Sequence, residues 1–210
     1  MFIQNGVIIL GAFAAFGAIH SLMAGARLKE RLIPVLGERF TEGWYRLVYN
    51  ALSAVTVFPV LLAIVLLPDR QLYQLASPWS VLLRLVQLAG LAGLVGALFV
   101  TDVWHFAGIK QAAAYLNADP LPLPAPDLQE KGMYRYVRHP LYFFSLALIW
   151  ATPVLTTNWL WFNAGATLYF AVGSLVEEQR LVRAYGDAYR QYQARVSWLI
   201  PWFPAHRDPE

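Results

Sequence analysis

The chain has 210 residues, of which 58% are hydrophobic and 14% charged, and its mean hydropathy is +0.45. Soluble domains are about 45–50% apolar and about 25% charged, so this composition excludes an ordinary soluble domain and indicates contact with lipid. The net charge is +3, but the basic residues lie at the ends of apolar segments, which favours membrane orientation over nucleic-acid binding. The absence of cysteine excludes disulfides, thiolate nucleophiles and cysteine metal sites.

Five apolar segments approach the roughly 20 residues that a membrane-spanning helix needs. In chain order they are residues 2–23, 44–67, 82–104, 140–156 and 159–176. The first basic residue, Arg27, follows the first segment, so we expect a span there and not a cleavable signal peptide. The last two segments are separated by a short uncharged turn and are predicted to form a helical hairpin. No strand is evident, which excludes a soluble Rossmann-type nucleotide site.

The third segment contains glycines at positions 90, 93 and 96. Small residues allow membrane helices to approach closely. These glycines therefore predict helix packing and not a ligand site.

The positive charges predict the orientation of the chain. Only Arg70 and Arg84 fall in or beside the connections that five spans would place on the outer side. The other basic residues fall on the inner side: Arg27, Lys29, Arg31, Arg39, Arg46, Lys110, Lys131, Arg135, Arg138, Arg180, Arg183, Arg190, Arg195 and Arg207. Because basic residues favour the cytoplasmic side, the N-terminus is predicted outside and the C-terminus inside.

Two inner segments are more than simple connectors. Residues 105–139 are long for a loop and contain four closely spaced prolines between 120 and 126, which favour an extended path. Residues 177–196 place apolar side chains at helical spacing and predict an amphipathic helix on the inner surface, in direct continuation of the fifth span or separate from it. The predicted fold class is thus all-α: a polytopic bundle of about five transmembrane helices with a cytoplasmic amphipathic helix.

The densest polar cluster, residues 132–142, lies where the inner loop enters the fourth span. Pro140 suits the first turn of a helix, whose free N–H groups attract carboxylates and phosphates. Arg138 offers a bidentate fork for a carboxylate, and His139 can donate or accept a proton. The alternative interpretation is an interfacial belt in which the arginine reaches the surface and the tyrosines anchor the helix.

Two further sets of ionisable residues lie near span ends. Glu177 and Glu178 are adjacent carboxylates that can bind a cationic group, unless the span has already ended and both are solvated. His20 and His105 lie on different helices at similar depth, close to Asp102, and are compatible with haem ligation as well as with ordinary interfacial positions. No metal-ligand spacing is evident, so no metal site is predicted.

Residues 132–142, with their Arg-His-Pro-Leu-Tyr core, resemble the signature of the isoprenylcysteine carboxyl methyltransferase-like and phospholipid methyltransferase-like membrane enzymes. The second half of that signature follows in order, from Glu177 and Glu178 to Pro201. The segments around His20, Tyr45 and 102–111 are similar to a bacterial branch with methanethiol S-methyltransferase-like and NnrU-like proteins.

This resemblance implies S-adenosylmethionine as the cofactor and methyl donor. It also implies cofactor-binding roles for ten residues: Gln111, Tyr134, Tyr136, Val137, Arg138, His139, Tyr142, Glu177, Glu178 and Tyr189. Three residues are candidates for assisting the acceptor, namely His139, His105 and Arg180. The region 1–104 is expected to be a three-span membrane part and 105–210 the cofactor-binding part of one integrated domain.

The resemblance therefore predicts an integral membrane methyltransferase, in a bacterial inner membrane with its active site facing the cytoplasm. The expected partners are membrane lipids and a small or lipid-like methyl acceptor, with a thiol or a prenylcysteine-like carboxylate favoured, and no nucleic acid. Two alternatives stay open at this point: a phospholipid N-methyltransferase, and a haem-binding or redox-accessory protein of the NnrU-like type.

Overall fold

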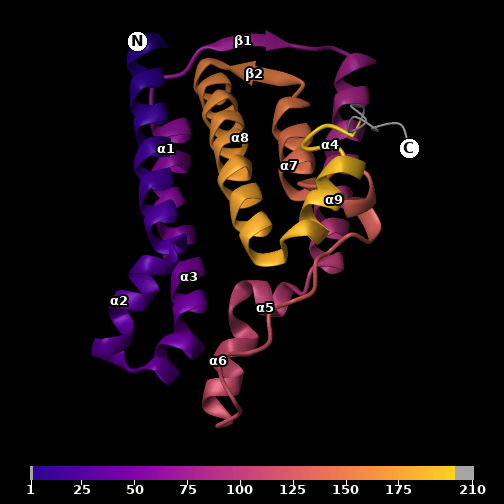
Figure 1. The fold of residues 1–210 in the computed structure, drawn as a ribbon. Coiled ribbons are helices and arrows are strands. Elements are labelled where there is room, and N and C mark those ends of the chain that lie inside the picture. Colours follow the sequence, from indigo (N-terminus) through magenta and orange to yellow (C-terminus); the bar gives the residue numbers. More distant parts are fainter. Residues whose placement is uncertain (1, 202–210) are drawn as a thin grey trace. The chain divides into compact units, whose positions relative to one another are not determined.

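The computed structural model describes residues 2–201, and most of them are helical (Figure 1). The elements in chain order are α1 (Phe2–Ala24), α2 (Ala26–Leu36), α3 (Glu38–Leu66), β1 (Gln71–Gln74), α4 (Trp79–Val100), α5 (Val103–Ala107), α6 (Ile109–Leu116), the 3-10 helix η1 (Gly132–Arg135), α7 (Pro140–Trp150), β2 (Val154–Thr156), α8 (Thr157–Tyr185) and α9 (Asp187–Arg195). One compact unit contains the chain up to Pro68 together with Asp102–Pro126, and a second contains Asp69–Thr101 together with the chain from Asp127. Arg207, counted above among the inner charges, lies outside the described residues.

Four of the described helices, α1, α3, α4 and α8, are long and apolar enough to cross a membrane. Many of their large apolar side chains are exposed, for example Val65 at 79% and Leu168 at 63%. Soluble monomers rarely expose so much contiguous apolar surface, so these faces require lipid or another apolar partner. The predicted all-α membrane bundle is confirmed, and the chain is an integral membrane protein.

Helix α7, the predicted fourth span, is shorter than its apolar segment 140–156. Its 11 residues extend only about 16 Å, roughly half of the hydrocarbon core. Pro153 lacks an N–H and disfavours a helical backbone at Thr152, which accounts for the end of the helix just before them. Strand β2 follows and pairs antiparallel with β1, with Gln71 opposite Thr156. The expectation of no strand is therefore wrong here: after the helix ends, backbone groups on both segments are satisfied by pairing.

In the second unit, α4 packs along α7 through two of the three predicted glycines. A Cβ at Gly90 would lie 3.2 Å from the backbone N of Leu148, and one at Gly93 would lie 2.3 Å from the ring of Phe144. A Cβ at Gly96 would meet nothing within 4 Å. Glycine at positions 90 and 93 thus permits the close approach of these two helices.

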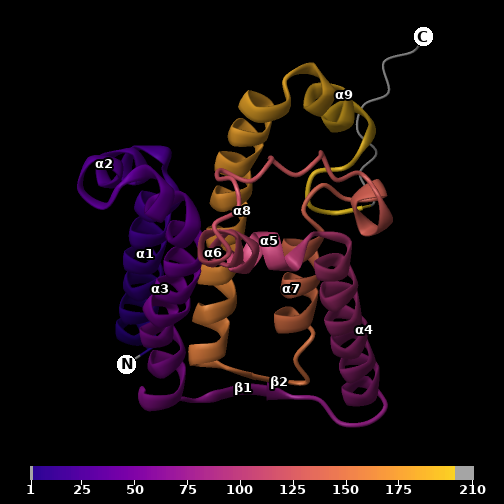
Figure 2. The ribbon, with the colours of Figure 1, turned by 90° about the horizontal axis from the view of Figure 1, so that it is seen from below.

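In the first unit, α1 and α3 lie side by side (Figures 1 and 2). The segment 105–139 was expected to be a long loop with an extended path at its four prolines, but its first part is helical. Asp102 caps α5 by accepting from the backbone N of His105 at 3.0 Å. Gly108, with φ +89, turns the chain from α5 to α6 so close to α3 that a Cβ would lie 2.5 Å from the N of Leu47. The four prolines come later, between α6 and η1.

The predicted amphipathic segment 177–196 is divided between two helices. Helix α8 continues without a break to Tyr185, and Gly186, with φ +59 and ψ −129, then redirects the chain into α9. Both glutamates therefore lie inside the last turns of α8. Within the second unit, α9 lies at one end of α8 and the β1–β2 pair at the other (Figure 2).

Candidate functional site

Segment 132–140 enters α7 in a conformation that places the consecutive side chains of Arg138 and His139 at the site. Gly132 adopts φ +59 and lies so close to Val100 that a Cβ there would be 2.8 Å from its Cγ2. After η1, Val137 forms a parallel bridge with Ser197, and the N of Arg138 donates to the carbonyl of Ser197 at 2.9 Å. The C-terminal segment is thus tied to the residues directly before α7.

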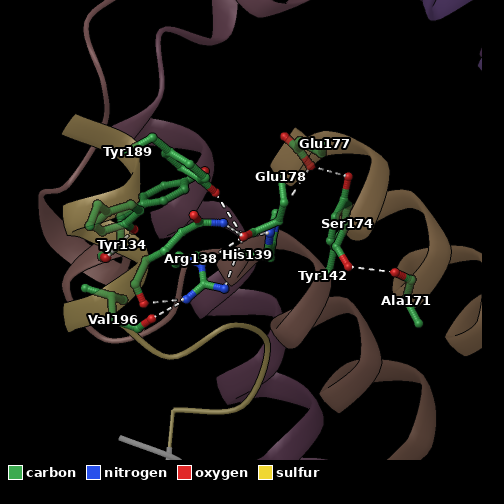
Figure 3. Close-up of polar contacts among 12 residues, drawn as sticks. Tyr134, Arg138, His139, Tyr142, Ala171, Ser174, Glu177, Glu178, Tyr189 and Val196 are labelled. Atoms are coloured by element: carbon green, nitrogen blue, oxygen red, sulfur yellow. Dashed lines mark hydrogen bonds and ion pairs between the residues drawn. The ribbon is translucent and has the colours of Figure 1, made fainter. Parts of the chain in front are cut away.

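Glu178 is the centre of the site (Figure 3). Its Oε1 accepts from Nε of Arg138 at 2.8 Å and from the hydroxyl of Tyr189 at 2.9 Å, and it lies 2.8 Å from Nε2 of His139. Its Oε2 accepts from Nη2 of Arg138 at 3.1 Å and from Nε2 of Gln193. Since a carboxylate offers about four lone-pair positions, these contacts use its full acceptor capacity.

Arg138 is held almost as completely as Glu178. Besides its two bonds to that carboxylate, its Nη1 donates to the carbonyl of Gln193 at 3.1 Å and to that of Val196 at 2.5 Å. Four of the five guanidinium N–H groups therefore bind protein atoms. The side chain joins the start of α7, the end of α8 and the segment after α9.

His139 is 5% exposed and lies between the two carboxylates. Its Nε2 contacts Glu178, and its Nδ1 lies 3.5 Å from Oε2 of Glu177. Burial by itself would lower the pKa of the imidazole, but the two carboxylates outweigh it and the pKa is raised above its usual value. The structure therefore favours the imidazolium form of His139.

Glu177 lies on the α7 side of α8 and has another set of contacts. Its Oε2 accepts from the hydroxyl of Tyr142 at 2.8 Å, and 45% of its side chain is exposed. The Tyr142 ring stacks on His139 with centroids 5.4 Å apart and on Phe170 with centroids 5.0 Å apart. The pair of adjacent glutamates is thus divided between two sides of the helix.

Helix α9 covers the site with its tyrosines. Burial and the neighbouring Glu178 carboxylate raise the pKa of Tyr189, so this phenol stays protonated and donates. Tyr192 donates to the carbonyl of Tyr134 at 2.6 Å and joins α9 to η1. Burial, together with the charge of Glu177, raises the pKa of Tyr134 to about 12.

A groove opens beside this network, between α8 and the chain that follows α9. One part, of about 550 Å³, is lined by Arg138, Leu175, Glu178, Gln179, Gln193 and Trp198. A second part, of about 300 Å³, shares Glu178, Gln179 and Gln193 and adds Val182 and Arg183. The groove therefore combines apolar, amide and charged groups, which is typical of sites for polar organic ligands.

Comparison with known proteins places the chain among membrane methyltransferases. The family described as phospholipid methyltransferase matches residues 85–188. Methanethiol S-methyltransferase 1 of Bradyrhizobium diazoefficiens is 32% identical over 203 residues, which cover 93% of this chain and 67% of that protein. Methanethiol S-methyltransferase of Mycobacterium tuberculosis is 31% identical over 210 residues, which cover 95% of this chain and 78% of that protein. The chain belongs to the methanethiol S-methyltransferase family.

This methyltransferase is also similar over a shorter stretch to the protein-S-isoprenylcysteine O-methyltransferase of Schizosaccharomyces pombe. The two are 40% identical over 78 residues, which cover 35% of this chain and 32% of that protein. No solved structure matches the chain at a significant level. The predicted superfamily and the predicted methyltransferase activity are confirmed.

Seven of the predicted site residues of the methyltransferase meet around α8 and α9 in the second unit. They are Tyr134, Arg138, His139, Tyr142, Glu177, Glu178 and Tyr189. Val137 is nearby but is 2% exposed and pairs with Ser197, whereas the Tyr136 side chain is 63% exposed. Arg180 is exposed on α8.

Two predicted site residues, His105 and Gln111, belong to the first unit and contact each other there. Nδ1 of His105 lies 3.2 Å from Nη1 of Arg46, and Gln111 donates to the carbonyl of His105 at 3.1 Å. Burial and the charge of Arg46 lower the pKa of His105. His20 instead lies 2.6 Å from the hydroxyl of Tyr49, so the contacts of the two histidines do not favour a shared haem.

Sequence reasoning missed six of the groove residues: Leu175, Gln179, Val182, Arg183, Gln193 and Trp198. Gln193 follows Tyr189 by four positions and therefore shares its face of α9, a signal that was present in the spacing. Trp198 lies beyond α9, where no periodic pattern predicts its position. Only the return of the chain to Val137 brings it to the groove.

Proposed function

We propose that the protein transfers the methyl group of S-adenosylmethionine to a small thiol, in a bacterial inner membrane with the site on the cytoplasmic side. One observation carries the proposal: the two motif halves, 132–142 and 177–201, meet in a buried Arg138–His139–Glu178 network on the wall of a groove. Relatives of the chain are named methanethiol S-methyltransferases, which supports a thiol over a phospholipid amine or a prenylcysteine carboxylate.

The groove has the chemistry that S-adenosylmethionine requires. This cofactor carries a flat heterocycle, ribose hydroxyls, a sulfonium, an ammonium and a carboxylate, and the lining offers apolar, amide, anionic and cationic groups. The side chains of Arg138 and Glu178 are both 11% exposed and bind each other. Their main role is therefore to fix the positions of α8 and of the chain after α9, which line the groove. A fixed wall allows the groove to align its ligand without further reorganisation.

When bound, S-adenosylmethionine supplies a methyl carbon attached to a positively charged sulfur. The acceptor sulfur would attack this carbon. Its new C–S bond would form as the C–S bond of the donor breaks, and the electrons of the broken bond would pass to the donor sulfur, giving a neutral thioether. The protein contributes mainly alignment and exclusion of water, which can lower such a barrier by about 7–11 kcal/mol.

The three residues expected to assist the acceptor are poorly suited to take its proton. Glu177 and Glu178 raise the pKa of His139, which favours its protonated form, and both ring nitrogens face these carboxylates. Nδ1 of His105 faces the Arg46 guanidinium, which can only donate, so the neutral ring carries its hydrogen on Nε2. The guanidinium of Arg180 offers N–H donors and no acceptor. We therefore propose that the thiol releases its proton to water.

Binding and turnover test the proposal directly. Purified protein in detergent is titrated with S-adenosylmethionine by calorimetry and then incubated with the labelled cofactor and three acceptors: methanethiol, a prenylcysteine and phosphatidylethanolamine. We expect binding, and label in the methanethiol product. If the wild-type protein does not bind S-adenosylmethionine, the proposal is wrong. If label appears only in a lipid product, the proposal of a thiol as the methyl acceptor is wrong.

A matched pair of variants tests the network. Glu178→Gln removes the charge that holds Arg138 and His139 and should weaken cofactor binding by about tenfold or more, because hydrogen bonds to charged groups contribute about 1.5–3 kcal/mol each. Asp187→Asn removes a carboxylate that is 85% exposed and should leave binding unchanged. Equal affinities in the two variants would contradict the role of the network.

A further inference from the structure

The groove changes in character along α8. Leu175, Gln179 and Arg183 are spaced by four residues, so they form one ridge of the helix. At 1.5 Å per residue, this ridge extends about 12 Å. Along it the lining passes from apolar through amide to cationic.

The two parts of the groove agree with this order. The part that contains Leu175 also contains Trp198, which is 36% exposed, and Arg138. Four of the five Arg138 N–H groups already bind Glu178 and the carbonyls of Gln193 and Val196, so this guanidinium is less available to a ligand than that of Arg183. The part that contains Arg183 lacks Trp198 and adds Val182. Gln179 and Gln193 line both parts. The groove thus has an aromatic end, a middle with two amides and a cationic end.

From this order we infer how the ligand lies: the adenine of S-adenosylmethionine binds at Trp198, and its amino-acid carboxylate binds at Arg183. The inference rests on the proposed function and adds a direction to it. A flat base stacks on an aromatic face, ribose hydroxyls bind the amides in the middle, and a guanidinium is the natural partner of a carboxylate. Tyr134 and Tyr136, for which the resemblance implies cofactor-binding roles, are not among the residues that line these two parts of the groove.

The test separates the two ends with a truncated ligand. 5′-Methylthioadenosine carries the adenosine but neither the carboxylate nor the ammonium. Trp198→Leu should weaken the binding of both S-adenosylmethionine and 5′-methylthioadenosine by about tenfold, since base stacking contributes about 1–3 kcal/mol. Arg183→Gln should weaken S-adenosylmethionine by about tenfold and leave 5′-methylthioadenosine unchanged.

Two control variants accompany the measurement. Trp198→Phe keeps an aromatic face and should retain most of the affinity, which separates stacking from a general loss of structure. Trp79→Leu removes a tryptophan that is 63% exposed at the start of α4, outside the groove lining, and should change neither affinity. Melting temperatures in detergent establish that each variant is folded.

The outcomes distinguish the inference from the proposed function. If wild-type protein does not bind S-adenosylmethionine, the proposed function fails and the inference fails with it. If the wild-type protein binds S-adenosylmethionine but Trp198→Leu binds 5′-methylthioadenosine as tightly as the wild type does, only the inference is overturned. A loss of 5′-methylthioadenosine binding in Arg183→Gln would reverse the assigned direction and overturn it as well.

Discussion

At the scale of single residues, the adjacent Glu177 and Glu178 show that two identical side chains on one helix can have different contacts. Successive residues on a helix point about 100° apart. Glu178 therefore faces α9 and the groove, where five contacts hold it, and Glu177 faces Tyr142 and remains 45% exposed. The difference is one of environment, because the chemistry of the two carboxylates is the same.

The raised pKa of His139 predicts a pH dependence of stability. A histidine whose pKa is higher in the folded than in the unfolded state stabilises the fold fully below about pH 6.5, and this contribution is lost as pH rises through the folded-state pKa. The melting temperature of wild type should therefore exceed that of His139→Gln most at pH 6 and progressively less towards pH 9.

His105 is the matched control for that measurement. Its pKa is lowered, so any contribution of its neutral form is present above pH 6.5 and is lost as pH falls. The gap between wild type and His105→Gln should not shrink between pH 6 and pH 9. A gap for His139→Gln that stays constant or widens over this range would show that its imidazolium is not favoured by the fold.

At the scale of elements, the helix pair α4–α7 shows how a short helix is kept in place. Helix α7 is too short to cross a bilayer alone, but its backbone lies against Gly90 and its Phe144 ring against Gly93. Its last turn is also held from α8, where Nδ2 of Asn163 donates to the carbonyl of Ile149 at 3.0 Å. Close packing against α4 and this hydrogen bond from α8 therefore stabilise the position of the short helix α7.

Gly93→Ala should therefore destabilise the second unit. A Cβ at that position overlaps the Phe144 ring, and overpacking of this kind costs about 1–3 kcal/mol, or a few degrees in melting temperature for a chain of this size. Gly96→Ala adds the same methyl group three residues later, where nothing lies within 4 Å, and should be tolerated. Equal melting temperatures for the two variants would refute close packing at position 93.

At the scale of the whole molecule, most of the basic residues and the site residues lie in the same segments of the chain, those predicted to be on the inner side. The segments predicted to lie inside contain Arg138, the glutamate pair and α9, and the β1–β2 pair lies at the other end of α8. The predicted orientation therefore puts the site and most of the basic residues on the same, cytoplasmic side.

The predicted orientation can be measured because the chain contains no cysteine. Single cysteines at the exposed positions Ala76 and Asp187 are labelled with a membrane-impermeant maleimide in intact bacterial cells and again after permeabilisation. Ala76→Cys should react in intact cells, and Asp187→Cys only after permeabilisation, since basic segments stay inside. The opposite pattern, or labelling of both in intact cells, would contradict an outer N-terminus and an inner C-terminus.

The apolar segments and the charged segments between them were evident in the sequence. Hydropathy is a sum over neighbouring residues, so the long helices α1, α3, α4 and α8 follow from local composition. The cluster at Arg138 and His139 and the glutamate pair were also recognisable, because their residue types are unusual at the ends of apolar segments. The division into the regions 1–104 and 105–210 stays a prediction.

What each of these side chains contacts was decided only by the tertiary structure. Arg138 was expected to bind a cofactor carboxylate, but its donors reach Glu178, 40 residues away, and the carbonyl of Val196, 58 residues away. Trp198 enters the groove only because the chain after α9 returns to Val137. A hydrogen bond depends on distances and angles between groups far apart in the chain, and no local pattern encodes those. The sequence therefore determined which residues carry the chemistry, and the folded chain decided which of them face the ligand and which hold the site together.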